Sequence, residues 1–186
     1  MYKLLSIIFC ALIACSNLHA QEFVIDVPKQ SSNAFARDFV KLLNEAPNYF
    51  KEIADKSVDK GDSAYVKVAI RKSKIRLKGA TSALIVMDSI PFAEYFFGRF
   101  HSAEEADAAY INLTNSIAEA LNRKVLFKTE EGKATSMVKQ TKIAYALNSG
   151  FFLHNIVVQL NRNFIDSSYH LFLKIRGGKP PFFYKI

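Results

Sequence analysis

The sequence predicts an α+β fold, in which a mostly antiparallel sheet of about seven or eight strands combines with an N-terminal helical segment and one long crossover helix. Strand-like runs with a two-residue period occupy residues 64–100 and 124–176. One strongly helical stretch lies between these runs, and another precedes them. No repeat, linker or low-complexity tract interrupts residues 21–186, so we expect these residues to form a single domain.

The long helix is expected to begin at Ser102 and to end at Asn122. Ser102 and Glu105 have the spacing of a capping box, in which the hydroxyl and the carboxylate each accept a hydrogen bond from a backbone N–H near the helix start. Apolar residues then recur at three- and four-residue steps and share one face: Ala106, Tyr110, Leu113, Ile117 and Leu121. Because this face needs a sheet to cover it, the helix is expected to cross over between two parts of the sheet.

The N-terminal helical segment is expected to start at Asn33 or at one of the two serines before it. Its apolar face would be formed by Phe35, Phe39, Leu42 and Leu43. Pro47 interrupts this helix and suits the first turn of a second short helix over residues 47–55, with Phe50 and Ile53 facing inward. Residues 56–63 are polar and predict a loop.

Apolar and basic residues alternate through residues 65–78. A hairpin that turns at Lys72 and Ser73 would pair Ile70 with Ile75 and place the cations together on the opposite face. The predicted binding face consists of five residues: Lys67, Arg71, Lys74, Arg76 and Lys78. A single bulged strand is the alternative, because a Lys-Ser turn lacks the Gly or Asn that tight hairpins prefer.

Residues 1–20 have the pattern of a secretion signal, with a basic start and an apolar run too short to span a bilayer. Cleavage after Ala20 would give a soluble product. Alternatively, residues 12–15, Leu-Ile-Ala-Cys, resemble the lipobox of bacterial lipoproteins. This resemblance implies a lipoprotein signal over residues 1–14, lipidation of Cys15 and anchoring in a membrane. In either case we expect an exported protein that is periplasmic, extracellular or attached to a bacterial envelope.

The chain carries 25 Lys and Arg against 17 Asp and Glu, a net charge of +8, which favours an anionic partner. We expect an envelope surface or an acidic protein rather than nucleic acid, and membrane anchoring only if Cys15 is lipidated. No catalytic or phosphate-binding motif is recognisable, and we expect no cofactor. His101, His154 and His170 are separated in the sequence, so a metal site is not expected either. A binding or structural domain of the envelope is therefore favoured over an enzyme.

Two alternatives remain open at this point. The first is a carrier of an apolar ligand in a cavity lined by phenylalanine, since Phe92, Phe96 and Phe100 would share one strand face with Phe97 on the other. Packing in the core is the more usual cause of such a stripe and is favoured here. The second alternative is an envelope hydrolase whose polar residues meet only in the folded chain.

The lipobox interpretation predicts that Cys15→Ser releases the protein from the membrane fraction, because the acyl chains on Cys15 would be what holds it there. Mass spectrometry of the N-terminus checks this directly. A mature wild-type chain that begins at Gln21 would rule out the lipoprotein interpretation.

Overall fold

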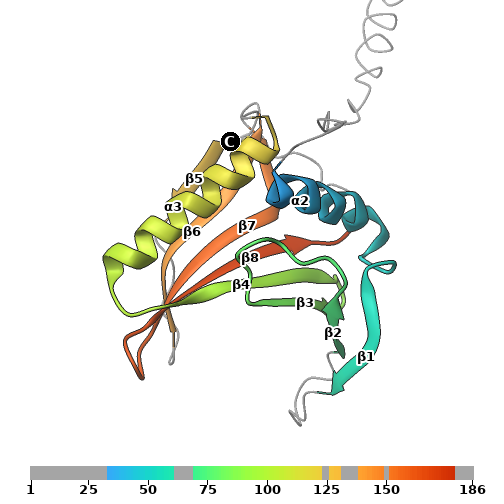
Figure 1. The fold of residues 1–186 in the computed structure, drawn as a ribbon, viewed down its shortest axis with the longest axis horizontal. Helices are drawn as coiled ribbons and strands as arrows, with labels where there is room; N and C mark the ends of the chain where they lie inside the picture. Colours follow the sequence, from blue (N-terminus) through green and yellow to red (C-terminus); the bar gives the residue numbers. More distant parts are fainter. Residues whose placement is uncertain (1–32, 61–68, 123–125, 131–137, 149–150, 179–186) are drawn as a thin grey trace, which may run out of the picture.

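The computed structural model describes residues 33–60, 69–122, 126–130, 138–148 and 151–178 (Figure 1). The signal segment with Cys15 and the predicted binding residue Lys67 lie outside these ranges. Neither helix in the described ranges combines the length and the apolar character needed to cross a membrane.

The strands form one sheet in the order β1-β2-β3-β4-β8-β7-β6-β5, and all neighbouring strands are antiparallel. Two meanders, β1 to β4 and β5 to β8, meet where β4 pairs with β8. This sheet and its helices confirm the α+β fold. The strands are β1 (Ala54–Lys60), β2 (Ala69–Ser73), β3 (Ser82–Met87), β4 (Phe92–Phe100), β5 (Leu126–Glu130), β6 (Val138–Asn148), β7 (Phe151–Asn163) and β8 (Tyr169–Arg176).

The predicted crossover helix is α3 (Ala103–Ala120), which connects β4 in the middle of the sheet to β5 at its edge. Ser102 is its N-cap, and the hydroxyl accepts a hydrogen bond from the backbone N–H of Glu105 at 3.1 Å. The N-terminal helix is α2 (Ala34–Glu45), capped by Asn33. Both helices lie on the same face of the sheet and contact each other (Figure 1).

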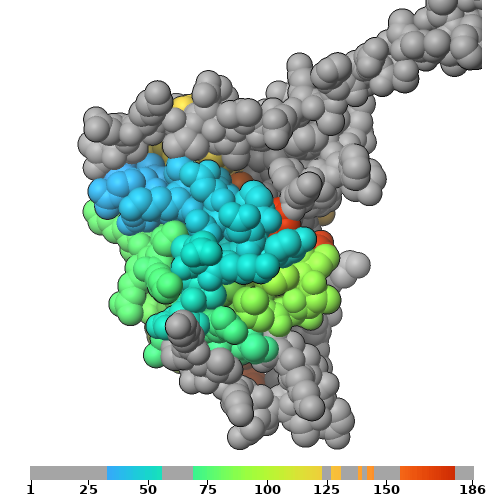
Figure 2. Space-filling model, turned by 90° about the vertical axis from the view of Figure 1, so that its right-hand side faces the viewer, coloured from blue at the N-terminus to red at the C-terminus, as the bar shows by residue number. Residues whose placement is uncertain are grey.

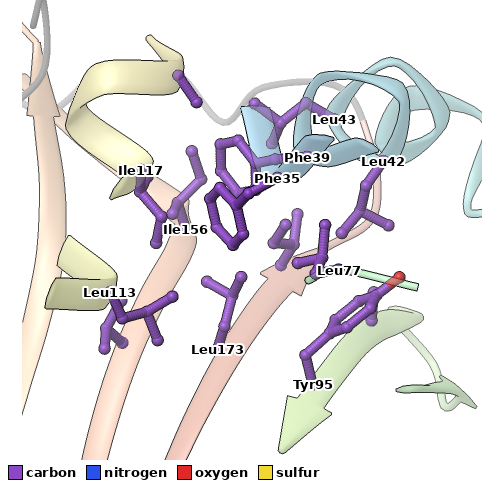
Figure 3. Close-up of a cluster of buried hydrophobic side chains, with 14 of the residues drawn as sticks. Phe35, Phe39, Leu42, Leu43, Leu77, Tyr95, Leu113, Ile117, Ile156 and Leu173 are labelled. Carbon is purple, nitrogen blue, oxygen red and sulfur yellow. The ribbon is translucent and has the colours of Figure 1, made fainter. Parts of the chain in front are cut away.

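The hydrophobic core fills the space between the two helices and the sheet (Figure 3). All five predicted stripe residues of α3 are buried, as are the four predicted on α2. Phe35 and Phe39 stack with their ring centroids 5.7 Å apart. The central strands contribute the other half of this core: Ala93, Tyr95, Ile156, Val158, Leu160, Leu171, Leu173 and Ile175.

The predicted hairpin at Lys72 and Ser73 is wrong. β2 pairs with β1 on one side and with β3 on the other, so Ile70 lies opposite Asp59 and Val86 instead of Ile75. After Ser73 the chain leaves the sheet and runs under α2. Leu77 is buried there, only 2% exposed, next to Leu42 (Figure 3). Over residues 74–78 the alternation of apolar and basic residues therefore reflects one buried side of an extended segment.

The prediction for residues 47–63 is partly wrong. A single 3-10 turn, η1 (Ala46–Asn48), replaces the second short helix, because Tyr49 and Phe50 adopt left-handed backbone conformations that end it. Phe50 and Ile53 are buried as predicted. Strand β1 occupies part of the predicted loop. As an edge strand it pairs only with β2, and its polar sequence lacks the usual strand alternation.

The prediction that Phe100 shares a face with Phe92 and Phe96 is also wrong. A register shift in the pairing of β4 with β8 lies between Phe96 and Gly98, where one extra residue is accommodated. Beyond this bulge the side-chain alternation is reversed. Phe97 and Phe100 therefore both pack against the core beneath the helices.

Replacing Leu113 with Ala is expected to lower the free energy of unfolding by about 2 to 5 kcal/mol, since the side chain is 5% exposed and its removal leaves a cavity. Urea denaturation measures this loss. Asn112→Ala, at an exposed position of the same helix, is the control and should be nearly neutral. Equal small effects at both positions would mean that the buried face of α3 is not the one described.

Candidate functional site

A small hollow lies where β2 leaves the sheet and β3 begins. Its volume is about 170 Å³. Two cations, three hydroxyl side chains and three apolar side chains line it: Lys72, Arg76, Ser73, Thr81, Ser82, Ala80, Ala83 and Leu84. The positive charge of the two cations is what suits this hollow to an oxyanion.

The segment that carries these residues, the β2–β3 connection of residues 74–81, is tied to the sheet by hydrogen bonds. The Tyr95 hydroxyl donates to the backbone carbonyl of Ile75 at 3.0 Å and accepts from the Ser73 hydroxyl at 3.0 Å. Thr81 donates twice to the carbonyl of Phe96, through its backbone N–H at 2.8 Å and its hydroxyl at 3.1 Å. The hollow is therefore fixed at both ends of the connection.

Apolar side chains fix the middle of the connection. Leu77 is buried, and Ile75 and Ala80 pack against the same core. The connection lies directly below α2 in the side view, where it appears green beneath the blue helix (Figure 2). Since alternate residues of this extended segment point inward, Arg76 and Lys78 are exposed.

The structure separates the five predicted binding cations. Lys67 is outside the described residues, and the other four do not form one row. Arg71 lies opposite the buried Ile85, on the side of the sheet that faces the helices, and its Nε is buried without a hydrogen-bond partner. Lys74 donates from Nζ to the backbone carbonyl of Glu52 at 3.0 Å. Only Arg76 of the five lines the hollow, and Lys78 is an exposed residue two positions further along the same connection.

Sequence reasoning missed Lys72 because it placed this residue in a turn. Its position on the solvent side of β2 is set by the pairing with Leu84 of β3, which brings both side chains to the hollow. Lys72 lies within the run of basic residues between Arg71 and Lys78, and this run was the signal in the sequence that could have identified it.

Lys72, Arg76 and Lys78 make no ion pair with an acidic side chain anywhere in the described ranges. Other cations of the sheet and its helices do have such partners. Lys142 contacts Asp107 at 2.8 Å, and Lys174 contacts Glu94 at 3.0 Å. Lys72 and Arg76 at the hollow, together with Lys78 on the same connection, are therefore a local excess of positive charge without a directly paired acidic side chain in the described residues. We refer to Lys72, Arg76 and Lys78 as the basic cluster.

A serine, an aspartate and a histidine meet at the start of β8. The Ser168 hydroxyl donates to Asp166 Oδ1 at 2.6 Å and lies 3.1 Å from His170 Nε2. Because its single proton goes to Asp166, the hydroxyl can only accept a hydrogen bond from the histidine, which therefore cannot act as its base. Ser168 is also only 1% exposed. The cluster is a structural brace, and its hydrogen bonds hold the pKa of Asp166 below its ordinary value, with a smaller contribution from Arg99.

Of the other histidines, only the side chain of His101 is described. His101 is exposed just before α3, and the side chain of His154 lies outside the described part of the structure. Within the described residues, no group of three His, Cys, Asp or Glu side chains is arranged to hold a metal ion.

The face of the sheet opposite the helices carries aromatic and charged side chains. Phe96 contacts Phe172 with ring centroids 5.1 Å apart and His170 at 5.7 Å, edge to face. Lys174 Nζ lies 5.9 Å from the centroid of the Phe172 ring. These rings contact one another on the sheet surface, and none of them lines the hollow.

No protein-family model matches the chain, and neither a curated protein nor a solved structure is significantly similar to it. What the hollow can bind is therefore inferred from its own side chains.

Tyr95 should make the stability of the protein sensitive to alkaline pH. Burial raises the pKa of this hydroxyl from 10.0 to about 12, against an opposing effect of the Ser73 hydrogen bond. Between these values the unfolded chain loses the tyrosine proton while the folded chain keeps it, so stability falls as pH rises, by about 1.4 kcal/mol per pH unit.

Urea midpoints of the wild-type protein and of Tyr95→Phe, measured from about pH 9 to about pH 11, test this expectation. The wild type should be the more stable protein at the lower pH, and its advantage should shrink at the higher pH. Groups shared by both proteins cancel in the comparison. An advantage that stays constant would mean that the hydroxyl is not buried as described.

Proposed function

We propose that the protein is an exported binding domain of the cell envelope, and that the basic cluster with its hollow binds an anionic partner such as an acidic polysaccharide or an acidic protein. The observation that carries this proposal is that two cations without acidic partners, Lys72 and Arg76, line the hollow, with the exposed Lys78 two residues further along the same connection. The predicted secretion signal supports the compartment, and the net charge of +8 supports the sign of the partner.

The basic cluster favours binding of an extended anion over tight binding of one small ion. Arg76 presents a planar fork that suits a carboxylate, sulfate or phosphate group, and the flexible Lys72 and Lys78 can follow charges spread along a chain. The hollow, at about 170 Å³, is small compared with a polymer of such groups. A polymer with repeated anionic groups would engage all three side chains.

The carrier and hydrolase alternatives gain less support. The hollow is lined by small and polar side chains, and the phenylalanines of β4 are divided between the core and the open sheet face. The serine near His170 is buried and has the wrong hydrogen-bond direction for a nucleophile.

Retention on immobilised dextran sulfate at low salt tests the proposal. The double variant Lys72→Glu with Arg76→Glu should bind at least tenfold more weakly, because losing two attractions and gaining two repulsions should cost more than the roughly 1.4 kcal/mol that a tenfold change requires. Retention of the wild type should also fall as salt is added.

The matched control is Lys51→Glu with Arg176→Glu, which changes the net charge equally at two exposed positions outside the hollow. Circular dichroism should show that both variants remain folded. Equal loss of retention in the two variants would mean that net charge alone determines binding, and no retention of the wild type would reject the proposal.

A further inference from the structure

The turn between β7 and β8 exposes two adjacent large apolar side chains. Ile165 is 82% exposed, the highest value for a large apolar residue in the described ranges, and Phe164 is 51% exposed. The hairpin projects beyond the neighbouring elements at the lower left of Figure 1. Single exposed apolar residues are common, but a neighbouring pair at a projecting tip is characteristic of a contact surface.

The turn is held by its own hydrogen bonds. The Asn163 side chain accepts from the backbone N–H of Ile165 at 2.9 Å, and the Asn163 backbone N–H donates to the carbonyl of Ser168 at 2.8 Å. Asp166 accepts from the backbone N–H of Ser168 at 2.9 Å. These bonds fix the backbone so that Phe164 and Ile165 stay in solvent.

Positive charge lies at the base of this tip. Arg162 and Lys139 are direct partners across β7 and β6, both exposed, and neither pairs with an acidic side chain in the described structure. Like charges in such a position are mildly destabilising. Asp166 is the only acidic residue in the hairpin, and Arg99 neutralises it at 2.7 Å.

We propose that this tip is a membrane-contact element: Phe164 and Ile165 enter the interface of a bilayer while Arg162 and Lys139 contact anionic phospholipid headgroups. In a bilayer the acyl chains lie deeper than the phosphates. Apolar side chains at the end of the tip, with cations behind them, would therefore reach the acyl chains while the cations remain at the level of the phosphates. Two side chains provide contact and orientation rather than permanent anchoring.

A bilayer fits this tip better than a protein partner does. A stable protein interface buries about 800 Å² on each side, far more than two side chains at a convex turn offer. A bilayer requires no complementary pocket. The tip and the basic cluster are on different connections of the sheet, so this inference is independent of the proposed function.

The chain contains no tryptophan, so one introduced indole reports on its own surroundings. We would place it in the full chain, with Cys15→Ser in every variant, as Ile165→Trp. The matched control is Ile90→Trp, which lies in the β3–β4 turn and is also exposed. That turn is at the opposite end of the sheet, since Phe92 pairs with Arg176 whereas Phe100 pairs with Tyr169.

Vesicles of phosphatidylcholine mixed with phosphatidylglycerol should shift the emission of Ile165→Trp to the blue, and brominated lipids should quench it. The emission of Ile90→Trp should stay unchanged. Adding Arg162→Glu and Lys139→Glu to Ile165→Trp should reduce the shift severalfold on these vesicles.

Three results would overturn the inference. The first is emission from Ile165→Trp that vesicles do not change, and the second is equal shifts for both indoles. The third is a blue-shifted emission without lipid that depends on protein concentration, which would show that a second copy of the chain covers the tip.

Discussion

Burial of one face of the sheet beneath two helices is the interaction on which the rest of the structure depends. Phe39, Ile117 and Leu173 meet in this layer and are fully buried, and each contributes about 1.5 to 3 kcal/mol by leaving water. The chain has no cysteine beyond Cys15 that could brace the strands by a disulfide, so this core must hold both meanders together. The pairing of β4 with β8 joins them at the centre, and each meander is preceded by one of the two helices.

The same one-sided burial also creates the basic cluster. Leu77 is drawn into the core below α2, and Tyr95 holds the connection by its hydrogen bond to Ile75. Arg76, between these anchor points, and Lys78, directly after Leu77, are left facing water. The packing of Ile75 and Leu77 against the core thus places the basic residues between and after them on the exposed side of the β2–β3 connection.

The sequence was sufficient for the elements whose signals agree with one another. Helix α3 has a cap, a stripe of buried residues and acidic residues in its first turn, so it was predicted nearly to its ends. The regular two-residue alternation of β8 lies within the second predicted strand-like run. The predictions failed where one sequence pattern can arise from two different structures. Alternation over residues 74–78 marks an extended segment with one buried side, and it does not require a strand partner. The bulge beside Gly98 turns Phe100 inward. A glycine within a strand is compatible with a bulge, but the register that makes the bulge is set by pairing with β8.

The central claim is that the hollow beside Lys72 and Arg76 is where an anion binds. Backbone amide shifts in a ¹H–¹⁵N NMR titration with a short sulfated oligosaccharide at low ionic strength test this most directly. The claim predicts that the largest shifts fall on the residues that line the hollow, with smaller ones on the rest of the β2–β3 connection. Shifts spread evenly over all exposed cations, or centred on another part of the sheet, would contradict it.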